Sequence, residues 1–267
     1  MYNFRCSNLD FIDWSMDFEI LMKFVFQEPS TLCLISEISS ALKNVISYKD
    51  LSEVVNRISF DPLVCATRTL TIDDVTVDEY SMPLVPPDAS SSLPANIYAD
   101  GNCLPRAASL FAYHTEDCHE ELRYRIIQEL VQNSEYYLSE ALNFGGGTKA
   151  AQTFAMFSEF FTAESFLKKS VQTIFEEETL SICMCGTYMG AWQIAALAAV
   201  LQRPVRSVYP VYAGATVRKD LHRMFYPRGE ITGDQGEAME VLWTNTQGVD
   251  LKPREWRPNH FVLLVHS

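Results

Sequence analysis

Apolar residues recur every three to four positions through much of the chain, which is the period of a helix that buries one face. In the N-terminal part, this pattern predicts three helices within residues 10–58. The second follows Ser30, a residue type that caps helices, and the third spans Asp50 to Ile58. Further stretches with the helical period are residues 117–132, 150–161, 164–175 and 191–201. The last of these is apolar on nearly every side, so we expect a buried helix there.

Short apolar or β-branched runs predict strands between and after these helices. They cover residues 64–72, 205–209, 239–243 and 261–265. The run Phe261-Val262-Leu263-Leu264-Val265 has no polar interruption, which is typical of a central strand buried on both faces. Helices around a short sheet indicate an α/β or α+β fold.

Residues 59–96 have no sustained helical period. An acidic run is followed by several prolines and by Ser90-Ser91-Ser92, which is the composition of a loop or linker. We therefore predict a boundary near residue 92. Residues 1–91 form an N-terminal helical extension and linker, and residues 92–267 form the main domain.

The composition narrows the class of protein. With 267 residues, 48% of them hydrophobic, the chain can bury a substantial core, and its net charge of −13 argues against a nucleic-acid-binding surface. It has no run long enough for a membrane span and no signal-peptide pattern. Cys183 and Cys185 lack the further ligands of a zinc site, so we expect no metal. The seven cysteines show no disulfide-framework spacing, and we expect a monomer in the cytoplasm or nucleus without nucleic-acid or membrane partners.

The stretch Asp100-Gly101-Asn102-Cys103-Leu104 predicts a tight turn that delivers a cysteine to the first turn of a helix. Gly101 supplies the backbone freedom of the turn, and Pro105 is tolerated where a helix begins. The positive end of the helix dipole lowers the pKa of a thiol placed there, and free N–H groups of the turn can stabilise an oxyanion. The alternative is an ordinary buried cysteine.

A histidine stands directly before the last apolar run, in Arg257-Pro258-Asn259-His260. At the mouth of a buried strand its ring is held rigidly, which suits a general base. A lone histidine is more often a surface or core residue, but a catalytic thiol needs a nearby base. Cys103 and His260 are therefore the candidate catalytic pair.

These residues resemble the ovarian-tumour (OTU) family of cysteine proteases. The resemblance rests on the turn with Arg106, on the loop and helix from Gly186 to Leu201, and on His260 before its strand. Arg123 is similar to the arginine of the helix that follows the catalytic helix in the family. The resemblance covers the predicted main domain and implies an α+β, papain-like core.

The family implies a deubiquitinase, which hydrolyses the isopeptide bond between the ubiquitin C-terminus and a lysine. By this resemblance Cys103 is the nucleophile and His260 is its general base. The backbone N–H groups of Asp100, Gly101, Asn102 and Cys103 would form the oxyanion hole. The implied partner is ubiquitin or polyubiquitin, and no cofactor is needed.

The sequence departs from the family at two positions. Pro105 replaces an aromatic or other large residue, and Val262 stands where many members carry the Asp or Asn that orients the histidine. Three kinds of residue can replace that orienting group: Asn259, Asp100, or an upstream acid such as Asp73 or Asp74, as in one subgroup of the family. The sequence does not choose among them.

A weaker similarity, in Tyr136-Tyr137-Leu138 and in Ala198 to Pro210, is to the vertnin family. It implies relatives without the catalytic pair, which this chain retains. An active deubiquitinase is therefore the first expectation, and an OTU-like binding or regulatory module is the alternative.

Overall fold

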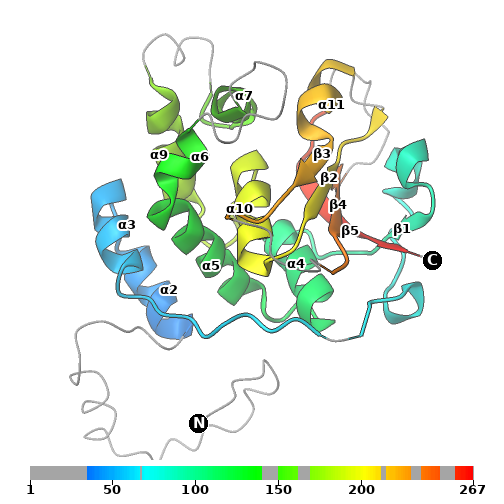
Figure 1. Cartoon of the computed structure of the whole chain (residues 1–267), viewed down its shortest axis with the longest axis horizontal. Coiled ribbons are helices and arrows are strands. Elements are labelled where there is room, and N and C mark those ends of the chain that lie inside the picture. The colour runs from blue at the N-terminus through cyan, green and yellow to red at the C-terminus, as the bar shows by residue number, and fades with distance from the viewer. Residues whose placement is uncertain are drawn as a thin grey trace, which may run out of the picture.

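The structure is a computed structural model that describes residues 35–66, 68–139, 150–161, 169–211, 215–229, 236–246 and 256–266. Within these residues, five strands form one mixed sheet in the order β1-β5-β4-β2-β3 (Figure 1). The strands are β1 (Ser92–Pro94), β2 (Val205–Val208), β3 (Arg223–Phe225), β4 (Met239–Thr244) and β5 (His260–His266). β2 and β4 run parallel, and the other neighbours are antiparallel. The strand with the uninterrupted apolar run, β5, thus lies inside the sheet.

The described helices pack around this sheet. They are α2 (Ile35–Lys43), α3 (Tyr48–Val55), α4 (Cys103–Tyr113), α5 (His119–Gln132), α6 (Ser134–Leu138), α7 (Ala150–Phe157), α9 (Val171–Ser181), α10 (Ala191–Leu201) and α11 (Ala215–Leu221). Figure 1 shows α3, α5, α6 and α9 away from the strands, with α4 and α10 between. α4 contacts β5 and β4, and α10 contacts β2 and β3. The expected α+β class, a short sheet flanked by helices, is confirmed.

Most elements predicted for the main domain are present. The predicted helix at residues 191–201 is α10, and the three predicted strands beyond residue 200 are β2, β4 and β5. The helix expected after the Asp100 turn begins at Cys103. α9 begins after Ser170, whose side chain accepts a hydrogen bond from Thr173 N, and runs further than predicted.

Other predictions are wrong or incomplete. The strand predicted at residues 64–72 is not formed by any of its described residues, and Val64 is 76% exposed. An apolar run without a neighbouring strand has no partner for its backbone groups. The short strands β1 and β3 and the helix α11 were not predicted, since three-residue strands carry too little alternation to detect.

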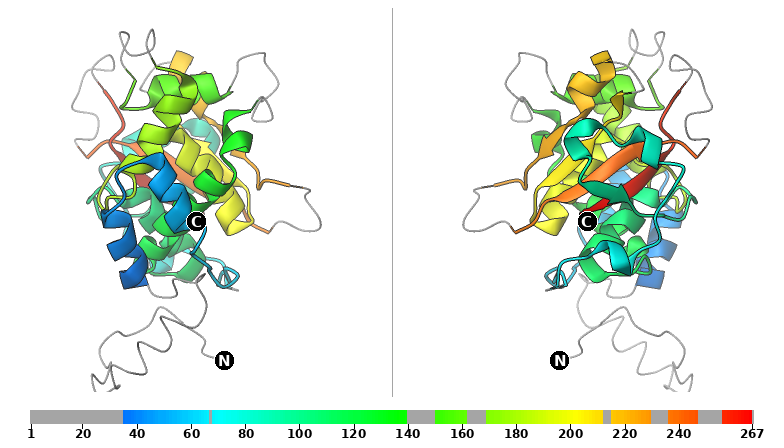
Figure 2. Two further views of the ribbon diagram at one scale, coloured as in Figure 1. Left: turned by 90° about the vertical axis from the view of Figure 1, so that its left-hand side faces the viewer. Right: turned by 90° about the vertical axis from the view of Figure 1, so that its right-hand side faces the viewer.

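Helices α2 and α3 both pack against α5, and α3 also packs against α9. Figure 2 shows α2 and α3 on the helical side of the molecule. Ser47 caps α3 by accepting a hydrogen bond from Asp50 N. Ile38, Leu42, Leu51 and Val55 are buried in the same hydrophobic core as the main domain. The first helix predicted for this region lies outside the described residues, and so does Ser30, the predicted cap of the second helix.

The predicted linker is tied to the main domain along its length. It contains the 3-10 turns η1 (Ile72–Asp74), η2 (Met82–Leu84) and η3 (Pro87–Ala89). Thr76 to Asp78 lies beside Pro94 to Asn96, with hydrogen bonds Asp78 N to Pro94 O (2.8 Å) and Asn96 N to Thr76 O (2.7 Å). This pairing carries residues 76–81 to the edge of the sheet where β1 and β5 meet.

Asp88, near the end of the linker, binds three basic side chains. Arg206 of β2, Arg218 of α11 and His222 approach its carboxylate at 2.9, 2.7 and 2.7 Å. The linker is therefore fixed to the far strands of the sheet as well.

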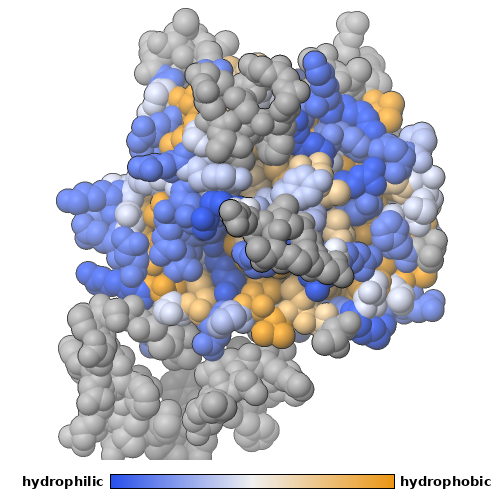
Figure 3. Space-filling model, in the orientation of Figure 1, coloured by the Kyte–Doolittle hydropathy of each residue, from blue (hydrophilic) through white to orange (hydrophobic). Residues whose placement is uncertain are grey.

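The surface mixes both kinds of side chain. On the face seen in Figure 3, hydrophilic and hydrophobic residues are interspersed. None of the helices in the described part of the chain is both long and apolar enough to cross a membrane.

Candidate active site

The turn before α4 is held by the carboxylate of Asp100. This carboxylate accepts hydrogen bonds from Asn102 N and Nδ2, both at 2.9 Å, and from Arg106 Nη2 at 2.7 Å. Burial favours the protonated acid, but the hydrogen bonds from Arg106 and Asn102 outweigh it and hold the pKa of Asp100 well below its usual range. Arg106 also lies over the ring of Tyr98, 5.4 Å from its centroid. The Asp100 side chain is thus directed to its own turn.

Gly101 allows a second loop to approach this turn closely. Its φ of +81° lies in the left-handed region, and a Cβ there would stand 1.6 Å from the carbonyl oxygen of Gly186. Gly186 in turn donates its N–H to Asn102 Oδ1 at 3.0 Å. The turn and the loop between α9 and α10 are therefore in backbone contact.

Arg123 of α5 forms hydrogen bonds with both of these segments. It has no exposed surface, and its guanidinium donates to Gly101 O, Asn102 Oδ1, Ile182 O and Thr187 O at 2.8 to 3.1 Å. Burial lowers the pKa of Arg123. Its charge is balanced by carbonyl dipoles rather than by a carboxylate hydrogen bond, so each of these contacts compensates for lost hydration.

Cys103 is buried at the start of α4, with 1% of its surface exposed. Burial raises the pKa of its thiol to about 11, although hydrogen bonds with the backbone of Phe261, Leu104 and Cys103 itself oppose this. The predicted lowering of the thiol pKa by the helix dipole is therefore wrong for this conformation, because desolvation is the larger effect. The contact with Phe261 places the thiol beside the first residues of β5.

His260 is the first residue of β5 and lies opposite Thr244 of β4. It is 6% exposed, and burial lowers the pKa of its ring. The charge of Asp78 opposes this most strongly, followed by a hydrogen bond with the Ile97 backbone and the charge of Asp100. The packing of α4 on β5 thus places Cys103 beside the strand that begins at His260.

Asp78 was not predicted as a site residue. Its carboxylate accepts hydrogen bonds from Ser81 Oγ at 2.5 Å and from Tyr80 N at 3.0 Å. Ser81 Oγ also lies 2.8 Å from Oγ1 of Thr244, the residue opposite His260. The acidic run is visible in the sequence. Only the pairing of residues 76–78 with residues 94–96 shows that Asp78 is the acid of this run that acts on His260.

The two upstream acids proposed from the sequence form no hydrogen bond with His260 in the described part of the chain, and Asp73 is exposed. Asp74 accepts two hydrogen bonds from Arg68, at 2.8 and 2.9 Å, and one from Thr71 N. Asn259 uses its amide on Thr246, accepting from the backbone N–H at 3.0 Å and donating to Oγ1 at 3.3 Å. Within the described residues, neither Asp74 nor Asn259 forms a hydrogen bond with His260.

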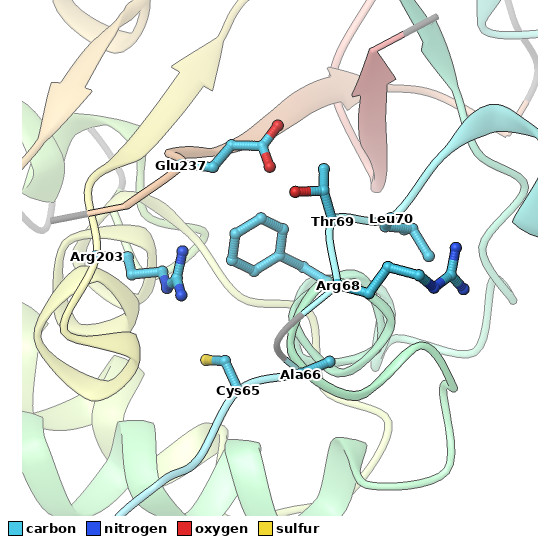
Figure 4. Close-up of a pocket in the computed structure, with 8 residues that line it drawn as sticks. Cys65, Ala66, Arg68, Thr69, Leu70, Arg203 and Glu237 are labelled. Atoms are coloured by element: carbon cyan, nitrogen blue, oxygen red, sulfur yellow. The ribbon is translucent and has the colours of Figure 1, made fainter.

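The cysteine pair considered as a metal site, Cys183 and Cys185, has no sufficient set of ligands within the described residues. No group of three metal-ligating side chains was found among the described residues, Cys183 and Cys185 included. A cavity of about 110 Å³ lies elsewhere, and its lining includes Cys65, Arg203 and Glu237 (Figure 4). It includes neither Cys103 nor His260.

The chain is similar in sequence to a known protein family. The profile of the vertnin OTU domain matches residues 94–244. Vertnin of Danio rerio is 28% identical over 196 residues, which cover 72% of this chain and 28% of that protein. Human vertnin is 28% identical over 208 residues, which cover 78% of this chain and 29% of that protein. The chain thus spans less than a third of the length of these relatives.

Two solved structures are also similar at low sequence identity. The OTU domain of OTUD1 is 13% identical with a TM-score of 0.37, over 70% of this chain and 99% of that one. The viral OTU domain protease from Farallon virus is 13% identical with a TM-score of 0.39, over 78% and 95%. The sequence match, which covers more than half of the chain, carries the assignment: the chain belongs to the vertnin OTU-domain family.

Proposed function

We propose that this protein is a cysteine-dependent deubiquitinase that hydrolyses isopeptide bonds of ubiquitin chains or conjugates. The observation that carries the proposal is the contact between the Cys103 thiol and the backbone of Phe261, the residue next to His260. The proposed nucleophile and the proposed base belong to segments far apart in sequence, α4 and β5, which pack against each other. Its membership of an OTU-domain family supports the same chemistry.

In the proposed reaction His260 takes the proton of the Cys103 thiol, and the thiolate attacks the carbonyl carbon of the isopeptide bond. His260 then gives this proton to the leaving lysine amine, which leaves a thioester on Cys103. Water attacks the thioester with His260 as base and releases the free carboxylate. The oxyanion is stabilised by N–H groups of residues 100–103, of which the Asn102 N–H already serves Asp100 in the free protein.

Asp78 is the orienting group in this proposal. Its charge opposes the lowering of the His260 pKa by burial, and its bond to Ser81, which contacts Thr244, holds its carboxylate at the end of β4 opposite His260. Asp100, Asn259, Asp73 and Asp74 were the sequence-based alternatives. Asp78 is favoured because its charge has the largest effect of any acid on His260.

A second function has one specific observation in its favour. Cys103 is 1% exposed and its thiol pKa is raised, so the free protein holds the nucleophile as a neutral, covered thiol. This is also what an OTU-like binding or regulatory module would contain.

A ubiquitin probe with a C-terminal electrophile tests the proposal. The folded protein should form a covalent adduct that is lost in Cys103→Ala and kept in Cys185→Ala, which removes an exposed free thiol nearby. Absence of an adduct in folded wild-type protein would favour the binding module. Cleavage of a set of di-ubiquitins would then define the linkage that an active enzyme prefers.

A further inference from the structure

Tyr188 lies in the loop between α9 and α10, and its ring stacks on Phe261. The two ring planes are 4° apart, and their centroids are separated by 5.2 Å. Phe261 is the residue whose backbone contacts the Cys103 thiol and whose neighbour is His260. Tyr188 as a whole residue is partly exposed. Its ring packs on the strand that begins at His260.

The hydroxyl of Tyr188 points inward. It is buried and has no hydrogen-bond partner among the described residues. Burial raises the pKa of Tyr188, and the nearby charge of Cys103 is the next contribution, which places this side chain close to the thiol. A buried hydroxyl without a partner is unfavourable, so this position of the ring is stabilised by its stacking and packing alone.

The loop that carries Tyr188 is anchored on both sides of it. Arg123 binds Thr187 O at 2.8 Å, and Gly190 N donates to Gln193 Oε1 at 2.7 Å at the start of α10. Only Tyr188 and Met189 lie between these anchors. A change of position here needs few backbone rotations and leaves the Arg123 contacts intact.

We propose that Tyr188 is an access-determining residue: its ring is a gate over Cys103 that must swing outward before a substrate carbonyl can reach the thiol. For its biological meaning this inference rests on the proposed function. The occupant that displaces the ring is an extended polypeptide tail, such as the C-terminus of ubiquitin, bound firmly enough by the rest of the surface to hold the gate open. Small reagents supply no such binding energy and reach Cys103 only when the gate opens spontaneously.

Two substitutions at this position have opposite expected effects. Tyr188→Ala removes the ring and should expose the thiol. Tyr188→Phe keeps the ring and removes only the hydroxyl without a partner, so the closed position should become more favourable. A purely structural role for Tyr188 would not produce effects of opposite sign on the reactivity of one cysteine.

The test is the rate at which iodoacetamide modifies Cys103 in the native full chain, followed by mass spectrometry of the peptide that contains it. Tyr188→Ala should raise the rate on the order of tenfold or more, and Tyr188→Phe should lower it several-fold. Cys65, a half-buried free thiol outside the site, is the internal reference for general unfolding. Tyr226→Ala, at a tyrosine that is 53% exposed beyond β3, is the matched control and should leave the rate unchanged.

The outcomes separate this inference from the proposed function. An unchanged Cys103 rate in Tyr188→Ala, or a rise matched by Cys65, would overturn the gate. So would a rate in Tyr188→Phe that equals or exceeds that of the wild type. If both rates behave as expected but the ubiquitin probe never reacts, the gate stands and the deubiquitinase proposal fails. If the probe reacts and the gate variants have no effect, the reverse holds.

Discussion

At the scale of single residues, His260 balances burial against charge. Burial favours the neutral ring, and Asp78 is the strongest of the groups that favour the protonated ring. A general base must accept a proton during the reaction, so a nearby carboxylate supports its catalytic state. The network from Asp78 through Ser81 to Thr244 keeps that carboxylate in place.

Asp78→Asn should therefore lower kcat for ubiquitin hydrolysis by about 10- to 100-fold with little change in KM, because the charge is lost and the shape is kept. The titration of His260, followed by NMR, should move to lower pH, since the group that raises its pKa is gone. Asp73→Asn is the matched control and should leave both quantities unchanged. Equal effects of the two substitutions would contradict a role specific to Asp78.

Two glycines with positive φ allow the energetic cost of backbone strain to be measured apart from the cost of steric contact. Gly229, with φ of +102°, has nothing within 4 Å of an added Cβ, whereas Gly101 faces Gly186 O at 1.6 Å. Gly229→Ala should cost about 1 kcal/mol of unfolding free energy, from strain alone. Gly101→Ala should cost about 3 kcal/mol or more, because the loop must also move. Urea unfolding of both variants measures the difference, and similar values would show that the loop yields freely.

At the scale of elements, Arg123 connects α5 both to the turn before α4 and to the loop between α9 and α10. Arg123→Lys keeps the charge but cannot reach four acceptors, so it should lower the unfolding free energy by about 3 kcal/mol. The same variant should lose reactivity of Cys103 toward the ubiquitin probe, since the turn is no longer fixed. Arg68→Lys, at an exposed ion pair with Asp74, is the control and should change stability little. Retention of full stability in Arg123→Lys would contradict this role.

The elements also define how far the sequence alone could lead. α10, β4 and β5 were predictable because their apolar runs are long and their periods are clear. Cys103 and His260 could be chosen as candidates from the sequence because turn chemistry and residue type both point to them. Asp78 was not, since its place depends on pairing between residues 76–78 and 94–96, which leaves no local pattern. The direction of the Cys103 pKa shift was predicted wrongly because it depends on burial, and burial is a property of the assembled fold.

At the scale of the whole molecule, the described segments between residues 35 and 91 are integrated into one core with the main domain. Leu51 and Val55 of α3 and Leu84 of η2 are buried with the residues around the sheet. Asp88 adds ion pairs to β2 and α11. Stability measured anywhere in the described chain should therefore report on this shared core.

A buried acid gives this core a dependence on pH. Glu178 of α9 is 6% exposed, and burial raises its pKa from 4.5 to about 7. In the unfolded chain the same carboxyl ionises near 4.5, so the unfolded state releases the proton first as pH rises. The unfolding free energy should therefore fall between pH 4.5 and about 7 and level off above that range.

Glu178→Gln should remove this dependence and stabilise the protein by about 3 kcal/mol above neutral pH. Denaturant titrations across the pH range provide the measurement. Glu176→Gln, on the same helix, is the control and should leave the pH profile as in the wild type. A profile for Glu178→Gln that still falls toward pH 7 would assign the effect to another group.

The position of β5 has a consequence for the life of the newly made chain. β5 is the last described element to be synthesised, yet it lies between β1 and β4 and carries His260. Until β5 is inserted, the sheet lacks the strand between β1 and β4, and Cys103 lacks its proposed general base. In terms of the proposed function, a folding intermediate without β5 would therefore be unreactive. Completion of the sheet and arrival of the proposed base would be the same folding step.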